Sequence, residues 1–389
     1  MRQGSLFAPD IDSNHDAIRN CIENKRVLVI GGAGTIGSSY IRAILPFHPA
    51  QLLVVDISEN GLTELTRDLR SSYGMYVPED YKTYPLIFAD PIFEKLFRGN
   101  RGFDIVANFS AHKHVRSEKD RWSVQALLEN NLLKARKFLD LISEFPPEHF
   151  FCVSTDKAAN PVNIMGASKR IMEDMIMAYS DRFKVTTARF ANVAFSNGSL
   201  LAGFIERLMK HQPLSSPNDV KRYFVSPEES GQICMLACLL GRNREIFFPK
   251  LKEDQMMTFS SIADKFLHTL GYEVKYCSSE EEARKFAAET PVDSKDYPVY
   301  YFKSDTTGEK GYEEFFVPGE HLDLTRFMNL GVIDSVKPRP KDEVFSFLSE
   351  LESILAKDDT TKETIVKALK GYLPNFNHEE KGKNLDQKM

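Results

Sequence analysis

The sequence has few cysteines, no long apolar run and no excess of basic residues, and each shortage excludes a class of protein. Its five cysteines are scattered over 389 residues, too few for a disulfide framework. No apolar stretch approaches the roughly 18 residues of a membrane span. Because 55 acidic residues outnumber 50 basic ones, the net charge is −5, which argues against a dedicated nucleic-acid binder.

The shortage of cysteine also bears on whether the protein binds a metal. Cys234 and Cys238 form the one close pair, one helical turn apart in an apolar run. A zinc site is one interpretation, but no second Cys or His pair is near, so two buried thiols are favoured and no metal is expected.

Residues 1–25 lack the apolar stretch of a signal peptide, and we expect a cytoplasmic protein.

The composition is otherwise that of a globular protein, with 42% hydrophobic and 27% charged residues. Short apolar runs alternate with helical stretches through the first half of the chain. The expected strands are Arg26–Ile30, Gln51–Asp56, Pro85–Ala89, Asp104–Phe109, His149–Ser154 and Lys184–Phe190. The expected helices are Ile36–Leu45, Glu59–Arg70, Ile92–Arg98, Val124–Ser143 and Ala167–Ser180. This alternation predicts an α/β fold with a Rossmann-like, doubly wound parallel sheet.

The regular alternation of strands and helices weakens after residue 195. With the two chain ends, this predicts four segments. Residues 1–25 form an N-terminal helical extension, and residues 26–195 form the Rossmann domain with the catalytic residues. A smaller substrate-binding lobe over residues 196–356 is interleaved with the core, and residues 357–389 form a C-terminal helix and a flexible tail. Within the lobe, Pro213–Val225 is expected to be irregular and Ser278–Lys310 to be a long polar segment.

A glycine-rich loop, GGAGTIG over residues 31–37, connects the first expected strand to a helix. Glycines at this point allow a tight turn and a close approach of the backbone to a pyrophosphate, and the helix directs its N-terminus at the phosphates. The motif is informative because it lies between a strand and a helix in the first βαβ unit. The residues assigned to the cofactor here are Gly31, Gly34, Thr35, Ile36 and Gly37.

Asp56 ends the second expected strand, 19 residues after Gly37. A carboxylate at this place accepts hydrogen bonds from the ribose hydroxyls of NAD and repels the 2′-phosphate of NADP. The residues that follow supply no arginine for that phosphate, so NAD is expected rather than NADP. The alternative is that Asp56 only caps the next helix.

Two further strand ends are assigned to the cofactor. Asp90 either contacts the adenine or caps the helix that begins at Pro91, and the sequence does not separate the two. Ser110 lies in a run of small residues after the fourth expected strand, where the backbone can pass close to the cofactor.

A second group of polar residues follows the fifth expected strand. Thr155, Asp156 and Lys157 come directly after it, and Lys169 lies one helical turn after Met165. Strand ends at the carboxyl edge of such a sheet form the floor of the active site. An Asp beside a Lys supplies an acid and a base at one place. The alternative is a surface ion pair of Asp156 with Lys157 or Lys169, followed by a solvated helix.

These motifs resemble the extended short-chain dehydrogenase/reductases, and among them the UDP-N-acetylglucosamine 4,6-dehydratases of bacterial polysaccharide biosynthesis. The resemblance extends from about Lys25 to about Ile333. Its segments are GGAGTIG (31–37), AHKHV (111–115), STDKAANPVNIMGASKR (154–170), RFANV (189–193) and RYFVSPEES (222–230). Met165 stands where the broad family has its catalytic Tyr, as in the subgroup of retaining dehydratases.

The resemblance implies an internal redox elimination with bound NAD. The sugar is oxidised at C4, loses its C5 proton and its C6 hydroxyl, and is reduced at C6. Thr155 would hydrogen-bond O4, and Asp156 would relay the O4 proton and act as the acid at C6. Lys157 would be the base at C5 if burial beside Lys169 lowers its pKa, and Lys169 would orient the cofactor ribose. Which of Asp156 and Lys157 performs each step stays open.

The substrate-binding residues implied are Lys113, Met165, Asn192 and Arg222. Met165 would pack against the nicotinamide or the sugar, and Arg222 would grip a phosphate. The Arg-Pro-Gly-Glu-Lys segment of the family reads Thr306-Thr307-Gly308-Glu309-Lys310 here, which leaves the nucleotide open, with UDP favoured.

Two other functions compete with the dehydratase. One is a nucleotide-sugar epimerase on the same scaffold, and the other is a non-catalytic NAD-binding regulator. In the family the helix after Met165 forms a dimer seam, so the resemblance also implies a homo-oligomer.

Overall fold

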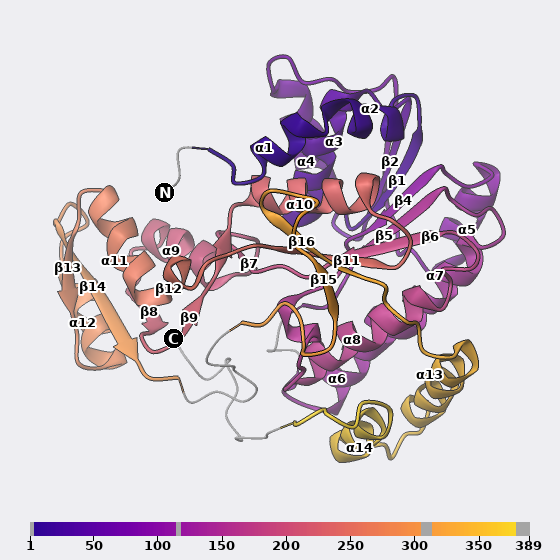
Figure 1. Ribbon diagram of the computed structural model, residues 1–389. Coiled ribbons are helices and arrows are strands. Elements are labelled where there is room, and N and C mark those ends of the chain that lie inside the picture. Colours follow the sequence, from indigo (N-terminus) through magenta and orange to yellow (C-terminus); the bar gives the residue numbers. More distant parts are fainter. Residues whose placement is uncertain (1–3, 114–117, 305–312, 379–389) are drawn as a thin grey trace. The chain divides into compact units, whose positions relative to one another are not determined.

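The computed structural model describes residues 4–113, 118–304 and 313–378, which form two compact units (Figure 1). The first unit comprises the described residues of Met1–Phe190, Glu228–Lys250 and Glu314–His378. The second comprises Ala191–Pro227 and Leu251–Glu313. These bounds differ from the expected lobe at 196–356, because residues 228–250 and 314–356 belong to the first unit.

The first unit is built on a nine-stranded sheet. Its strands, in spatial order, are β15 (His321–Asp323), β16 (Leu330–Asp334), β11 (Glu245–Pro249), β6 (Lys184–Ala188), β5 (His149–Val153), β4 (Ile105–Asn108), β1 (Arg26–Ile30), β2 (Gln51–Asp56) and β3 (Asp80–Pro85). The pairs from β3 to β11 are parallel, whereas β16 pairs antiparallel with both neighbours. The order 6-5-4-1-2-3 within this sheet is that of a dinucleotide-binding fold, so the expected fold class is confirmed.

The helices of this unit alternate with the strands along the chain (Figure 1). They are α1 (Ala8–Ser13), α2 (His15–Ile22), α3 (Thr35–Ile44), α4 (Glu59–Ser71), α5 (Pro91–Gly99), α6 (Arg121–Leu128), α7 (Ala135–Ile142), α8 (Ile164–Met177), α10 (Pro227–Leu240), α13 (Lys341–Leu355) and α14 (Lys362–Tyr372). The single helix expected over Val124–Ser143 is interrupted by a π-helical segment, Glu129–Lys134. Cys234 and Cys238 are buried in α10, as favoured.

The expected third strand was wrong. The sheet ends with β3 at Asp80–Pro85, whose side chains are half-buried or exposed, as at a sheet edge. The apolar run at Pro85–Ala89 follows this strand and packs as a loop. Phe88 is buried there, with its ring 5.7 Å from that of Phe138 in α7. The apolar residues that predicted a strand therefore belong to a packed loop. The true edge strand is polar, so its hydrophobic pattern did not predict it.

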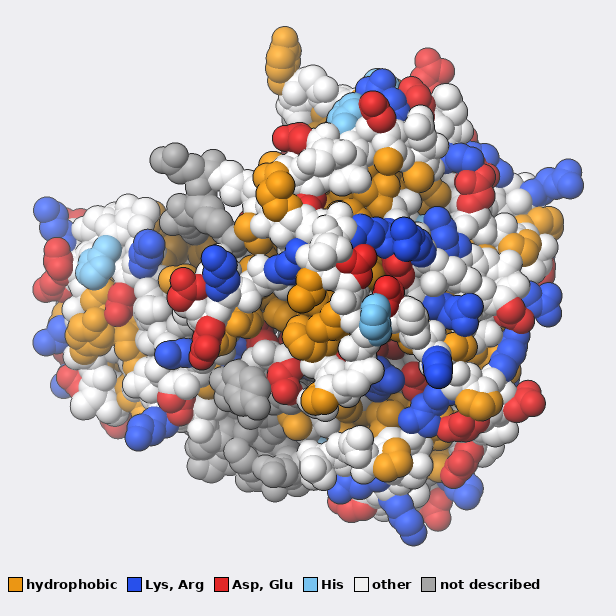
Figure 2. Space-filling model, in the orientation of Figure 1, with side chains coloured by type: hydrophobic (Ala, Val, Ile, Leu, Met, Phe, Trp, Pro, Cys, Tyr) orange, Lys and Arg blue, Asp and Glu red, His pale blue; other side chains and the backbone are white. Residues whose placement is uncertain are grey.

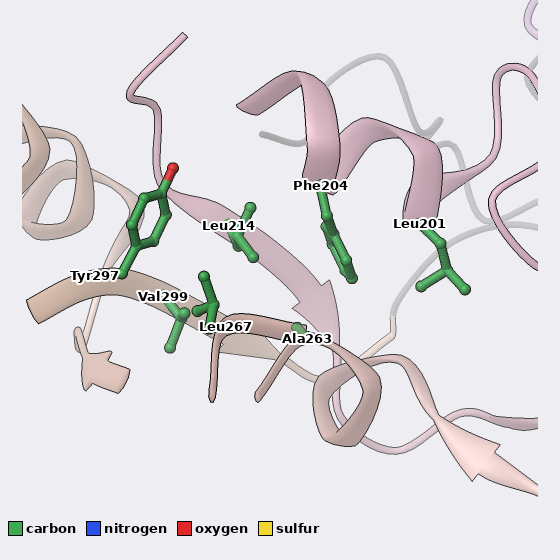
Figure 3. Close-up of a cluster of buried hydrophobic side chains, with 7 residues drawn as sticks. All are labelled: Leu201, Phe204, Leu214, Ala263, Leu267, Tyr297 and Val299. Atoms are coloured by element: carbon green, nitrogen blue, oxygen red, sulfur yellow. The ribbon is translucent and has the colours of Figure 1, made fainter. Parts of the chain in front are cut away.

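The second unit has its own sheet and core. Its main sheet has the order β13 (Glu273–Tyr276), β14 (Asp296–Phe302), β8 (Leu214–Pro217), and all its pairs are parallel. The helices are α9 (Leu200–Met209), α11 (Phe259–Thr269) and α12 (Glu280–Glu289). Figure 3 shows the core between them, formed by Leu201, Phe204, Leu214, Ala263, Leu267, Tyr297 and Val299.

Two short ladders complete this unit. β7 (Asn192–Val193) pairs in parallel with β10 (Phe224–Val225), and β9 (Lys221–Arg222) pairs antiparallel with β12 (Met257–Thr258). The expectation of irregular chain over Pro213–Val225 was wrong, since β8, β9 and β10 lie in it. The polar segment from Ser278 likewise contains α12 and β14. Pairing with strands distant in sequence forms these elements, and local composition does not record such pairing.

The C-terminal chain packs on α8. Arg339 forms an ion pair of 3.1 Å with Asp174, and the Tyr372 hydroxyl donates to the same carboxylate at 3.3 Å. Phe345 of α13 lies 5.5 Å, ring to ring, from Tyr179. In Figure 1, α13 and α14 are the two helices in the yellow part of the chain. Phe376 is buried, so the flexible tail expected within residues 357–389 does not include it. Residues 379–389 lie outside the described residues.

Candidate active site

The glycine loop is held against the end of β4. Gly31 has a φ of 75°, and a Cβ built on it would lie 2.7 Å from the backbone nitrogen of Ser110. A Cβ on Gly37 would overlap the carbonyl oxygen of Gly31. Helix α3 begins at Thr35, and its N-cap residue, Gly34, has no side chain that could cap the helix. This arrangement fits a pyrophosphate bound at the helix N-terminus.

Asp56 stands at the end of β2 and fastens the loop. One carboxylate oxygen accepts from the Ala33 N–H at 3.0 Å and the other from the Ser58 N–H at 2.9 Å. Ser58 itself caps α4, because its hydroxyl accepts from the Gly61 N–H at 3.1 Å. The alternative role of Asp56 as the helix cap is therefore filled by Ser58. Each Asp56 oxygen keeps lone-pair capacity for a ribose hydroxyl.

The two other cofactor candidates have different surroundings. Asp90 occupies the N-cap position of α5, but its carboxylate makes no capping hydrogen bond. The hydrogen bonds of this helix end therefore do not support the capping alternative, and the contact with the adenine stays a prediction. The backbone N–H of Ser110 donates to the buried side chain of Asn108 at 2.9 Å, which fixes the strand end beside Gly31.

The turn after β5 brings three sequence-predicted residues into mutual contact. The strand ends at Val153, and a 3-10 turn over Asp156–Ala158 follows, capped by Thr155. The Thr155 hydroxyl donates to Asp156 Oδ1 at 2.7 Å. Lys157 Nζ donates to the two Asp156 oxygens at 3.1 and 3.3 Å. The expectation that the chain leaves the strand before Asp156 is confirmed.

This ion pair does not lie on a solvated surface. Asp156 is only 4% exposed, and the Lys157 side chain is 25% exposed. The helix that follows, α8, is buried over nearly its whole length. A carboxylate so deeply placed is stabilised by its two donors, because burial without partners would cost several kcal/mol.

The amine of Lys169 is buried and bound by the main chain. Its Nζ donates to the Val153 carbonyl at 3.0 Å, at the end of β5. Burial lowers the pKa of this amine. The Lys157 amine donates to Asp156. The hydrogen bonds of the two amines therefore do not support the expectation that Lys157 is buried beside Lys169.

Two glutamates that sequence reasoning missed hold the helix of Met165 and Lys169. Glu118, 6% exposed, accepts from the N–H groups of Ile164 at 3.0 Å and Met165 at 2.8 Å. Asn163, whose side chain accepts from the Gly166 N–H at 2.7 Å, caps the same turn. A buried carboxylate at a helix N-terminus is favourable to the helix dipole.

Glu173 lies one turn beyond Lys169 and joins α8 to two strands. It accepts from the Ser154 hydroxyl at 2.6 Å and from the fully buried Arg189 at 2.7 and 2.9 Å. Burial alone would raise the pKa of Glu173, but the Arg189 guanidinium lowers it overall. Ser154 directly precedes Thr155, so this network fixes the start of the polar turn.

The substrate candidates fall into separate groups. Lys113 is exposed after β4, in the first unit. Asn192 and Arg222 lie in the second unit, where both contact the carboxylate of Glu313, a residue the sequence did not single out. Residues 114–117, with part of the AHKHV motif, and the segment Thr306–Lys310 lie outside the described residues.

The described part of the chain holds no group of three His, Cys, Asp or Glu suited to a metal ion. Nor does any of its helices combine the length and apolar character needed to cross a membrane. Figure 2 shows acidic and basic side chains interspersed over the face drawn.

Residues 27–333 match the family described as "Polysaccharide biosynthesis protein". The chain belongs to this family. A relative from Methanocaldococcus jannaschii, named an uncharacterised membrane protein, is 27% identical over 323 residues, 81% of this chain and 87% of the relative. A Campylobacter jejuni UDP-N-acetylglucosamine 4,6-dehydratase (inverting) is 25% identical over 261 residues, 64% of this chain and 73% of the relative.

Other relatives differ in activity or length. A Rickettsia bellii UDP-glucose 4-epimerase is 24% identical over 316 residues, 76% of this chain and 88% of that protein. The chain spans only 42% of a probable polysaccharide biosynthesis protein of Bacillus subtilis, at 28% identity over 66% of this chain. Among solved structures, a dTDP-glucose 4,6-dehydratase from Streptomyces venezuelae, with NAD bound, aligns at a TM-score of 0.56 and 19% identity, over 75% of this chain and 88% of that one. This likeness shows a shared fold.

Proposed function

We propose that the protein is a nucleotide-sugar 4,6-dehydratase that converts a UDP-N-acetylhexosamine, in the first instance UDP-N-acetylglucosamine, into a 4-keto-6-deoxy sugar nucleotide for surface polysaccharide or glycan biosynthesis. The observation that carries the proposal is the turn after β5. Thr155, Asp156 and Lys157 there place a hydroxyl, a carboxylate and an amine in one hydrogen-bonded group. Family membership and the dehydratase relative support it.

The cofactor in this proposal is NAD. Gly31, Gly37 and the N-terminus of α3 would hold its pyrophosphate, Asp56 its adenosine ribose and Lys169 its nicotinamide ribose. The close approach of Gly31 to Ser110 leaves no room for a side chain, as a dinucleotide loop requires. Bound NAD would supply reversible hydride transfer, which permits oxidation at C4 and reduction at C6 within one turnover.

The residues of the turn would move the protons. Thr155 donates a hydrogen bond to O4 of the sugar, and Asp156 receives the O4 proton. Once Asp156 is neutral, Lys157 releases its extra proton to water and, as the free amine, removes the C5 proton. Asp156 protonates the departing C6 hydroxyl, which leaves as water. Lys157 returns its proton to C5 as C6 is reduced, and it regains a proton from water, so both residues end the cycle in their starting states. Met165 packs, and Asn192, Arg222 and Lys113 bind the diphosphate and the sugar.

An epimerase is the second candidate, because an epimerase from Rickettsia bellii is also similar over most of its length. A non-catalytic NAD-binding regulator is the third, although it would have no need of the buried Asp156–Lys157 pair. Incubation with UDP-N-acetylglucosamine followed by mass spectrometry separates the three. A dehydratase product has lost one water, an epimerase product is an isomer of unchanged mass, and a regulator leaves the substrate intact.

A further inference from the structure

The carboxylate of Glu313 lies in a cradle formed by two hydrogen-bond donors and one guanidinium in the second unit. The Asn192 amide donates to Oε1, and the backbone N–H of Tyr223 donates to Oε2 at 2.8 Å. The Arg222 guanidinium lies 3.9 Å from Oε1. Phe224 of β10, which directly follows Tyr223, pairs with Asn192 of β7, and this pairing holds Asn192 near the Tyr223 N–H.

This cradle is buried. The side chains of Arg222 and Glu313 are 7% and 2% exposed. A buried cation requires an anion, and Glu313 supplies it. An amide, a backbone N–H and a guanidinium are also the donors that bind phosphate oxygens, so the cradle is chemically suited to either anion.

We infer that Glu313 and the diphosphate of the substrate compete for this cradle, so that substrate binding requires the Glu313 carboxylate to leave. The inference rests on the proposed function, which assigns Asn192 and Arg222 to the diphosphate. Both donors contact Glu313, and an added phosphate would place like charges in one buried site. The resting protein therefore binds nucleotide more weakly than its donors alone would allow, because the open cradle is only a fraction of the population.

The test is UDP binding by isothermal titration calorimetry. Glu313→Gln removes the competing charge and nearly preserves the shape of the side chain. We expect UDP to bind about 5- to 150-fold more tightly to this variant, the usual range of coupling between two ligands. Glu273→Gln, which changes an exposed carboxylate on β13 of the same unit, should leave the affinity unchanged.

Glu313→Ala gives an independent readout. Acetate should occupy the emptied cradle and weaken UDP binding to Glu313→Ala, while leaving UDP binding to the unsubstituted protein unaffected. Unchanged or weaker UDP binding to Glu313→Gln, or no effect of acetate, would overturn the inference and make Glu313 a residue that positions Asn192 and Arg222. If UDP binds neither the unsubstituted protein nor Glu313→Gln, the nucleotide assignment of the proposed function fails as well. If UDP binds as expected but the substrate is not dehydrated, the proposed function is contradicted and the inference about Glu313 is not.

Discussion

Asp156 and Lys157 share one ion pair, so their separate roles become visible when one is removed at a time. Lys157→Ala should still allow oxidation at C4 but should incorporate little solvent deuterium at C5, because the base is missing. Asp156→Asn should block the first oxidation, since nothing relays the O4 proton. Each should lower turnover by about 10²–10⁴-fold, as for a positioned acid or base.

Deuterium incorporation at C5, followed by mass spectrometry, checks this prediction. Lys95→Ala, at an exposed position on α5, is the matched control and should behave like the unsubstituted protein. Normal deuterium incorporation in Lys157→Ala would show that Lys157 is not the base, and the two roles would then be reassigned.

Met165 tests whether the residue at the usual tyrosine position takes part in the chemistry. The backbone N–H of Met165 donates to Glu118, and any residue except proline could make this bond. The Met165 side chain is buried. Met165→Leu nearly conserves volume and should cost less than about 1.5 kcal/mol of stability, with substantial activity retained. Steady-state kinetics checks this, and a loss as large as that of Asp156→Asn would reveal a role for the sulfur.

Asp56 tests the choice between NAD and NADP. Its carboxylate carries the charge that would repel a 2′-phosphate, and it also accepts from the Ala33 and Ser58 N–H groups. Asp56→Asn removes the charge while keeping one acceptor, so it should reduce the preference for NAD by about tenfold, equivalent to 1.4 kcal/mol. Dissociation constants for both dinucleotides measure the effect. Copurification of NADP with the unsubstituted protein would contradict the assignment.

At the scale of elements, the start of α8 depends on a residue distant in sequence. Glu118 accepts from two N–H groups of this helix, and Asn163 covers a third. Glu118→Gln removes the charge and leaves only one oxygen for these donors, so the free energy of unfolding should fall by about 1–3 kcal/mol. Urea denaturation measures the loss. Glu64→Gln, on the exposed face of α4, should show none, and equal stabilities for both variants would refute the capping role.

The elements that the sequence predicted well are those whose signal is local. β1 and β2 have the expected bounds because each is a short apolar run closed by glycine or a carboxylate. The turn at Thr155–Lys157 was found because its members are adjacent in the chain. Glu118 and Glu313 were missed because each reaches its partners across long sequence separations, 47 residues for Met165 and 121 for Asn192. Such contacts are fixed by tertiary packing, which a single sequence does not record.

At the scale of the whole molecule, the covering of α8 bears on assembly. The resemblance implies a dimer seam on this helix, yet the chain's own C-terminal segment contacts it. Arg339 and Tyr372 engage Asp174, and Phe345 packs on Tyr179. Phe347 of α13 stacks on Tyr372 of α14 at 4.3 Å, which joins the two covering helices. A second copy reaches this part of α8 only if α13 and α14 move, so we predict that a homo-oligomer forms through another surface.

A cysteine placed on α8 tests this expectation. Met175 follows Asp174 on the helix and is fully buried, so Met175→Cys should give no disulfide-linked dimer under mild oxidation. Asp181→Cys, at an exposed position just beyond α8, provides a thiol that a reagent should label at once. The native protein should protect the thiol at position 175 from the same reagent, and denaturation should expose it. A cross-linked dimer of Met175→Cys would show that α8 meets its counterpart in a partner, because a disulfide requires Cα atoms within about 7 Å. The contacts of α13 and α14 with Asp174 and Tyr179 would then have to open during assembly.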